Sequence, residues 1–105
     1  MKTTDIKTLD IHGKEWFDRI NGNSYHSVRV IINYGTPTQK TLVGSFRYGY
    51  GNSYEQTAGE LLADEVGESK YIYPLWSWCN DRNIVLRSDI QRKCLKRDVV
   101  AHGNP

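Results

Sequence analysis

The chain has 105 residues, of which 38% are hydrophobic and 25% charged, and its formal net charge at pH 7 is +2. The length is that of one domain, and the composition excludes wholesale disorder, because disordered chains carry fewer apolar residues and a larger net charge. The small net charge gives no argument for a nucleic-acid partner, since domains that bind nucleic acid are usually strongly basic.

The first residues, MKTTDIKTLDIHG, lack the continuous apolar core of a secretory signal, and no later segment is long enough to span a bilayer. We therefore expect a soluble, intracellular protein with no membrane partner. Cys79 and Cys94 are isolated from one another and from any larger cysteine set, so we expect both thiols to stay reduced in that compartment.

Two stretches of β-branched and aromatic residues predict the centre of a sheet. The segment VRVIINY alternates along its length, and the segment KTLVGSFRY does the same after a turn at residues 35–39. The dipeptide Asn21-Gly22 suits a tight hairpin turn, which places another strand before it. The sequence thus predicts a meander of strands at Lys14–Ile20, Ser24–Tyr34 and Lys40–Tyr50, with a weaker opening strand at Ile6–Ile11.

Helical periodicity replaces the alternation after residue 51. Ser53 and Gln56 have the spacing of a capping box, and Gly67 suits a left-handed helix end. Between them the apolar residues recur on one helical face: Tyr54, Ala58, Leu61, Leu62 and Val66. A short second helix is expected through LWSWCNDR, with Pro74 in its first turn, and the segment IVLRSDIQRKCL predicts a final strand.

This order of elements predicts one α+β domain, in which an antiparallel meander of about four strands carries both helices on one face. Residues of about 1–5 and 99–105 are expected to be frayed. Strict alternation along the strands puts Phe46 and Tyr48 under the main helix. It puts Arg29 and Arg47 together on the opposite, open face of the sheet.

No motif predicts catalysis, a cofactor or a bound metal. The glycine-rich segment YGYGNSY lacks the spacing of a phosphate-binding loop. We expect it to serve as a plain connection between a strand and a helix. The three histidines, His12, His26 and His102, do not have metal-site spacing. A pairing of His26 with Glu15 or Asp18 is retained only as a reserve hypothesis for an acid-base site.

Charge and aromatic residues favour a binding surface instead. Acidic residues between positions 55 and 68 are not interrupted by Lys or Arg, whereas residues 87–97 are mainly basic. The candidate partner-binding residues are Tyr25, Arg29, Arg47, Tyr50, Arg87, Arg92, Lys93, Lys96 and Arg97. The alternative is an acidic helix face formed by Glu60, Asp64 and Glu65. Tyr48, Tyr50 and Tyr54 could also stack exposed bases, although packing against the helix is the simpler role.

Three fragments carry a resemblance: IHGKEWFDRINGNSYHSVRVIIN, FRYGYGNSYEQTA and DIQRK. Together they resemble small bacteriophage-encoded proteins of unknown function, in which a W-F and G-N-S-Y segment precedes a Y-G-Y-G turn and a helix. The resemblance implies a phage or prophage source and a location in the host cytoplasm. It carries over no catalytic residue.

Three functional hypotheses follow. The first is a non-enzymatic protein that binds and inhibits a host protein or ribonucleoprotein complex, as an anti-defence (anti-CRISPR-like) inhibitor does. The second is a nucleic-acid-binding accessory protein that uses the basic sheet face and final strand. The third is a small enzyme using His26. A homodimer through an exposed sheet edge is compatible with each of them.

Overall fold

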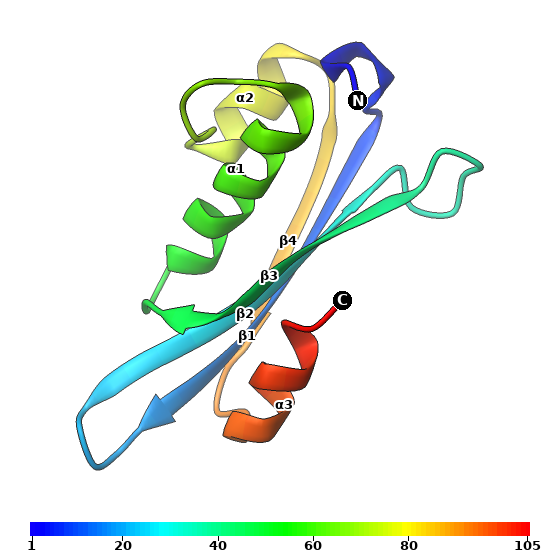
Figure 1. Ribbon diagram of the computed structural model, residues 1–105. Coiled ribbons are helices and arrows are strands. Elements are labelled where there is room, and N and C mark those ends of the chain that lie inside the picture. Colours follow the sequence, from blue (N-terminus) through cyan, green and yellow to red (C-terminus); the bar gives the residue numbers. More distant parts are fainter.

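The computed structural model describes every residue from Met1 to Pro105 and shows a four-stranded sheet with helices on both faces (Figure 1). The strands lie in the order β3-β2-β1-β4. In chain order the elements are η1 (Thr3–Asp5), β1 (Thr8–Asp18), β2 (Asn23–Ile32), β3 (Lys40–Tyr48), α1 (Ser53–Val66), α2 (Leu75–Asp81), β4 (Val85–Gln91) and α3 (Lys96–His102). None of these helices is long and apolar enough to cross a bilayer.

The first two predicted strands are one continuous strand. β1 runs through both of them and pairs with β2 from Leu9↔Ile32 to Asp18↔Asn23. Gly13 lies at the junction, where a Cβ would come within 2.8 Å of the Tyr54 ring. The glycine therefore marks a close approach of α1 to the sheet and not a break between strands.

The sheet is mixed, so the expectation of a purely antiparallel sheet was wrong. β4 pairs with β1 in parallel, from Thr8↔Val85 to Lys14↔Gln91. The physical reason is the path of α1, which runs back along the sheet after β3 (Figure 1). The chain then re-enters the sheet from the end where β3 began, and β4 must run in the same direction as β3 and β1.

The core lies between the sheet and the first two helices. Leu9, Ile11, Val30, Ala58 and Leu62 are all fully buried there. The remaining members of this core are Ile6, Val28, Ile32, Tyr54, Ala63, Ile72, Leu75, Cys79 and Ile84, with Leu61 and Val66 packed at its edge. The predicted apolar face of the main helix is therefore confirmed.

Of the two predictions for the ends of α1, one is confirmed and one was wrong. Gly67 ends the helix in the left-handed conformation, with φ of 79°. The capping box at the other end was wrong, because Asn52 is the N-cap residue and no side chain caps the helix. Ser53 donates its hydroxyl to the main-chain oxygen of Tyr50 at 2.7 Å instead, which ties the helix to the preceding glycine-rich turn.

The second face of the sheet is covered by α3, which the sequence did not predict. Val99 is fully buried, and its main-chain oxygen accepts a 2.7 Å hydrogen bond from the Ser27 hydroxyl of β2. A Cβ on Gly103 would come within 2.8 Å of the Phe46 nitrogen, so the chain passes directly over β3. Residues expected to be frayed therefore form a packed helix, and the helices do not all lie on one face.

A β-bulge in β3 changes which residues face which helix. Val28 pairs with Gly44 and His26 with Arg47, so two residues of β3, Ser45 and Phe46, lie opposite one residue of β2. Strict alternation fails at this point, because the extra residue reverses the facing of every side chain beyond it. Arg47 consequently lies on the α1 face, and Phe46 lies on the α3 face.

Candidate binding surface

A row of four aromatic side chains crosses three strands on the α3 face of the sheet. We call Trp16, Tyr25, Phe46 and Tyr48 the aromatic row. The Tyr25 ring stacks on Phe46 at 5.1 Å with an interplanar angle of 8°, and it stacks on Trp16 at 5.6 Å. Tyr48 meets Tyr25 edge-on at 5.8 Å and is 61% exposed. The row therefore begins beside α3 and ends at solvent on the outer strand.

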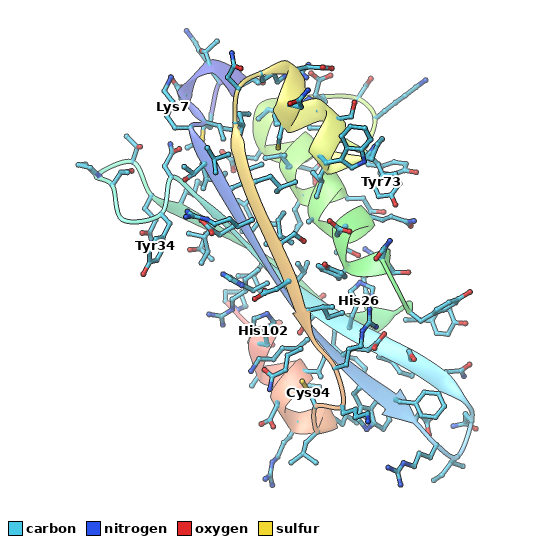
Figure 2. All side chains as sticks on the ribbon, turned by 180° about the vertical axis from the view of Figure 1, so that it is seen from behind. Lys7, His26, Tyr34, Tyr73, Cys94 and His102 are labelled. Carbon is cyan, nitrogen blue, oxygen red and sulfur yellow. The ribbon has the colours of Figure 1, made fainter.

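Cations adjoin this row at the turn between β4 and α3. Lys96 Nζ lies 5.3 Å from the centre of the Trp16 ring and 6.0 Å from that of Phe46, which is within the range of a cation–π interaction. Lys93 and Arg97 are exposed and make no ion pair. We call Lys93, Lys96 and Arg97 the basic corner; Cys94 marks its position in Figure 2.

The sequence predicted that Arg29 and Arg47 share an open face of the sheet, and this prediction was wrong. Arg29 lies beneath α3, where Nε donates to the main-chain oxygen of His102 at 2.9 Å and a terminal nitrogen donates to that of Asn104 at 3.1 Å. These acceptors lie in the last turn of α3 and just beyond it, where a positive charge is favoured by the exposed helix carbonyls. Arg29 thus holds the carboxyl terminus against the sheet.

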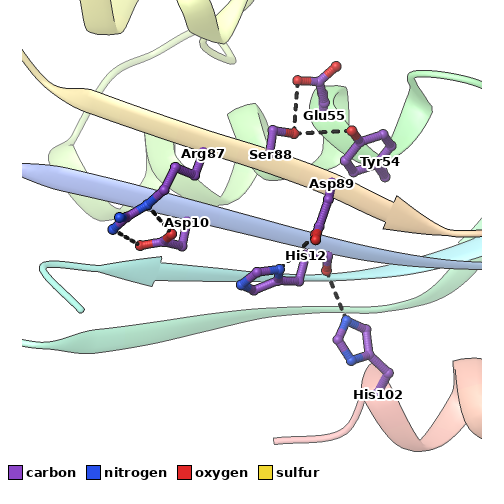
Figure 3. A network of polar contacts seen from close by, with 8 residues as sticks. All are labelled: Asp10, His12, Tyr54, Glu55, Arg87, Ser88, Asp89 and His102. Atoms are coloured by element: carbon purple, nitrogen blue, oxygen red, sulfur yellow. Dashed lines mark hydrogen bonds and ion pairs between the residues drawn. The ribbon is translucent and has the colours of Figure 1, made fainter. Parts of the chain in front are cut away.

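Three other predicted basic residues have acidic partners within the protein. Arg47 pairs with Glu60 of α1 at 2.8 Å, across the face opposite to Arg29. Arg87 makes two hydrogen bonds to Asp10, at 2.7 and 3.0 Å, and Figure 3 shows this pair joining β4 to β1. Arg92 pairs with Glu15 at 2.8 Å. Each guanidinium remains about half exposed, but its charge is already balanced.

The acidic helix face is also partly neutralised. Glu65 accepts hydrogen bonds from Lys40 at 2.9 Å, and its carboxylate lies 3.3 Å from the amino terminus of Met1. The hydrogen bond from Lys40 holds the pKa of the Glu65 carboxyl below its ordinary value. Glu60 is paired with Arg47, and of the three predicted acidic residues only Asp64 has no ion-pair partner.

His26 lies in the core with an exposed fraction of 2%. Both of its ring nitrogens have hydrogen-bond partners within the protein. Nδ1 donates to the main-chain oxygen of Gly49 at 3.2 Å, and Nε2 lies 2.8 Å from the Thr57 hydroxyl. Burial lowers the pKa of His26, so the neutral ring is favoured. Glu15 lies opposite His26 in the strand register, whereas Asp18 bonds to the hairpin turn at Asn21. His26 therefore links the sheet to α1 from a position closed to solvent.

His12 and His102 take part in a network of polar contacts that the sequence did not predict (Figure 3). His12 Nδ1 and the Asp89 carboxylate lie 2.7 Å apart across β1 and β4, and His102 Nε2 donates to the main-chain oxygen of His12 at 2.9 Å. Burial lowers the pKa of His102. The signal for this network lies in the register of a parallel strand pair, so a sequence read as antiparallel could not show it.

The two cysteines are free and lie in different layers of the protein. Cys79 is in the core, and burial raises the pKa of its thiol to about 11. Cys94 lies in the turn before α3, where its sulfur donates to the main-chain oxygen of Gln91 at 3.2 Å. Because a thiolate is the reactive form, the raised pKa makes Cys79 a packing residue.

A second aromatic group lies at the opposite end of the molecule, around α2. Tyr71, Tyr73, Trp78 and Arg82 line a shallow hollow of about 410 Å³. The Arg82 guanidinium lies 4.5 Å from the centre of the Trp78 ring, and so its charge is held against the hollow's own wall. Glu68, Lys70 and Asp81 also line the hollow and make no ion pair, so its free charges are of both signs, whereas those of the basic corner are all positive.

Comparison with models of known protein families, with curated proteins and with solved structures found no match to this chain.

Proposed function

We propose that this protein is a non-enzymatic binding protein that contacts a macromolecule through the aromatic row and the basic corner. The observation that carries this proposal is the position of Lys96, whose ammonium group lies over the Trp16 and Phe46 rings, in the same segment of the chain as the unpaired cations Lys93 and Arg97. Aromatic residues and Arg are enriched in protein interfaces, where buried rings contribute much of the binding energy.

Further exposed apolar groups lie at the same end of the sheet as the row, where β1 and β3 end. Tyr50 is 72% exposed after the end of β3, and Phe17 is 51% exposed at the end of β1. Ile20, at the tip of the β1–β2 hairpin, is 94% exposed. Large apolar side chains gathered at one end of a protein are a feature of contact sites, because isolated domains usually bury such groups.

The resemblance to small phage proteins directs the proposal toward a host component. On this view the protein binds a host protein or ribonucleoprotein complex in the host cytoplasm and inhibits it, as an anti-defence protein does. The basic corner favours an acidic partner surface, since charge complementarity speeds association and fixes orientation. The acidic helix face is the weaker candidate, because Glu60 and Glu65 already have partners.

A charge-reversal comparison tests this assignment. The immobilised protein is incubated with a lysate of the bacterium that carries the gene or hosts the phage, and retained proteins are quantified by mass spectrometry. The variant K93E/R97E should retain its dominant partner about tenfold less well, which corresponds to about 1.4 kcal/mol. The matched control, K2E/K70E, changes net charge equally at exposed positions elsewhere and should retain the partner. Equal retention by both variants would remove the basic corner from the binding site.

Nucleic-acid binding is the second candidate, and the cations beside the aromatic row favour it. Stacking of a base on a protein ring contributes about 1–3 kcal/mol. Arg29, Arg47 and Arg87 all have internal partners, so few cations are left to contact phosphates. Fluorescence anisotropy with labelled single-stranded and duplex oligonucleotides, over a salt titration, decides between the candidates. Absence of binding at low salt excludes nucleic acid, whereas a steep salt dependence supports it.

A further inference from the structure

The outer edge of β4 has main-chain groups that no strand pairs. β4 is an edge strand, because β1 is its only neighbour in the sheet. Figure 2, which shows the molecule from behind, has the β4 ribbon in front of β1. The Val85 nitrogen donates to the Lys7 oxygen at 3.1 Å, which fixes the phase of the parallel ladder. Because bonding alternates along a strand, Arg87 and Asp89 direct their main-chain groups toward β1. Leu86, Ser88 and Ile90 therefore direct theirs outward.

The side chains of this edge also alternate between the two faces of the sheet. Arg87 and Asp89 lie on the α3 face, where their side chains are 60% and 73% exposed. Leu86, Ser88 and Ile90 lie on the α1 face, where Leu86 and Ile90 are half-buried against the core. The edge thus has a charged side and an apolar side, and it is open to an incoming strand.

The geometry points to a second copy of this chain as the partner of this edge, with the two β4 strands antiparallel about a two-fold axis at Ser88. An antiparallel strand can bond only outward-directed residues to outward-directed residues. In this register Ser88 pairs with Ser88 of the second copy, and Leu86 pairs with Ile90. A two-fold axis closes the assembly at a dimer, because both copies use the same edge.

Charge selects this register over its neighbours. With the axis at Ser88, Arg87 lies opposite Asp89 of the second copy, and the relation is repeated on the other side of the axis. These are non-hydrogen-bonded positions, where cross-strand side chains approach most closely. Moving the axis by one residue would place Arg87 opposite Arg87, or Asp89 opposite Asp89, and like charges directly opposite one another are destabilising.

The charged groups keep their internal partners in this arrangement. Arg87 binds Asp10 through Nε and one terminal nitrogen, which leaves Nη1 without a bond. Asp89 contacts His12 through Oδ1, which leaves Oδ2. These two unused atoms are the ones available to the second copy. Glu55 accepts a hydrogen bond from Ser88 at 3.2 Å, so two Glu55 carboxylates approach the axis and oppose the dimer.

The other sheet edge is less suited to this pairing, because the bulge at Ser45 and Phe46 interrupts the regular spacing of β3. Dimerisation through β4 joins the two sheets into one continuous sheet. Because the axis is perpendicular to that sheet, both copies of α3 lie on the same face, with the two basic corners at opposite ends. This arrangement is independent of the partner proposed above.

Sedimentation velocity over a concentration series tests the dimer. The wild-type protein should pass from monomer to dimer. Ser88→Pro removes the outward N–H donor at the axis together with the serine side chain, and it should weaken self-association about tenfold or more. Ser88→Ala is the matched control, because it loses the same side chain but keeps the N–H, and it should still dimerise. Glu55→Gln should tighten the dimer. A wild-type protein that stays monomeric, or a Ser88→Pro protein that is folded and still dimeric, would overturn the proposal.

A cross-linking experiment keeps the proposal testable if Ser88→Pro does not fold. In a Cys94→Ser background, Ser88→Cys places two thiols at the axis, where paired Cα atoms about 5.5 Å apart are within disulfide range. Mild oxidation should give a covalent dimer. Ser45→Cys, an exposed serine on the other edge strand, is the control and should stay monomeric. Equal cross-linking of both variants would contradict the assigned register.

Discussion

Arg29 of β2 donates from Nε to the main-chain oxygen of His102 at 2.9 Å, so a strand residue fixes the last turn of the carboxyl-terminal helix. This contact joins a side chain of the central strand to a helix of seven residues. Isolated helices of this length are not stable in water, and α3 therefore depends on such tertiary contacts.

Replacing Arg29 by Ala should loosen α3 without unfolding the sheet. The variant loses two charge-assisted hydrogen bonds to helix-end carbonyls, and we expect a loss of about 1–2 kcal/mol in the free energy of unfolding. Amide hydrogen exchange should become faster in residues 96–102 and stay slow in β1 and β2. Arg19→Ala, in the exposed hairpin, is the control and should change neither measurement. Unchanged exchange in α3 would show that Val99 and Gly103 are sufficient to hold it.

Deleting Ser45 should preserve the aromatic row. The deletion removes the extra residue of the bulge, so Phe46 follows Gly44 directly, and alternation keeps Phe46 on the α3 face and Arg47 toward Glu60. We expect a loss of about 1–2 kcal/mol in stability, because the bulge sets the local twist of β3 where Gly103 packs on it. Near-ultraviolet circular dichroism should retain the signal of the stacked rings. Ser45→Gly, which keeps the chain length, is the control, and loss of the signal in the deletion variant alone would contradict the bulge assignment.

The elements that follow from local signals were predicted correctly from the sequence. The hairpin at Asn21-Gly22, the apolar face of α1 and its end at Gly67 each depend on residues close together in the chain. The errors concern long-range relations. The parallel pairing of β4 depends on where α1 returns the chain, and α3 has Val99 as its only buried residue, too few for a periodic pattern. The bulge places an exposed serine between Gly44 and Phe46, and its sequence alone looks like ordinary alternation.

The same reasons explain the outcome for the candidate site. The concentration of cations near residues 92–97 is a property of the sequence and does not depend on register. The sequence did not show that Arg29, Arg47 and Arg87 are engaged by His102, Glu60 and Asp10. Those partners are far away in the sequence, and only the folded arrangement shows which cations remain unpaired.

Replacing Gly59 by Ala should strongly destabilise the protein, although alanine is the better helix former. A Cβ at this position would clash with the main-chain oxygen of Ile72. The helical preference gained is about 1 kcal/mol, and we expect the clash with main chain to outweigh it, for a net loss of about 2–3 kcal/mol. Urea denaturation measures the difference. Gln56→Ala, an exposed position of the same helix, should stay within about 0.5 kcal/mol of wild type. A neutral Gly59→Ala result would mean that the segment before α2 can move away from α1.

Stability should fall as the pH is lowered through the titration range of histidine. His26 and His102 both have pKa values below the ordinary value of 6.5, mainly through burial. The unfolded chain therefore binds protons more readily than the folded protein between each folded pKa and about pH 6.5. The stabilising effect of neutral histidine is complete above that range and is lost progressively as the pH falls toward the folded pKa values. The depressed pKa of Glu65 acts only at lower pH, below 4.5, so the two effects can be separated.

Urea denaturation at pH 7.5 and 5.5 should therefore show a less stable wild-type protein at the lower pH. His26→Gln retains a side chain that can bond to Gly49 or Thr57 but does not titrate, and it should reduce the pH dependence even if its stability at pH 7.5 is lower. Adding His102→Gln should reduce the pH dependence of stability further. An undiminished dependence in the double variant would mean that other groups titrate in this range, and that burial of the two rings does not control the acid sensitivity of the fold.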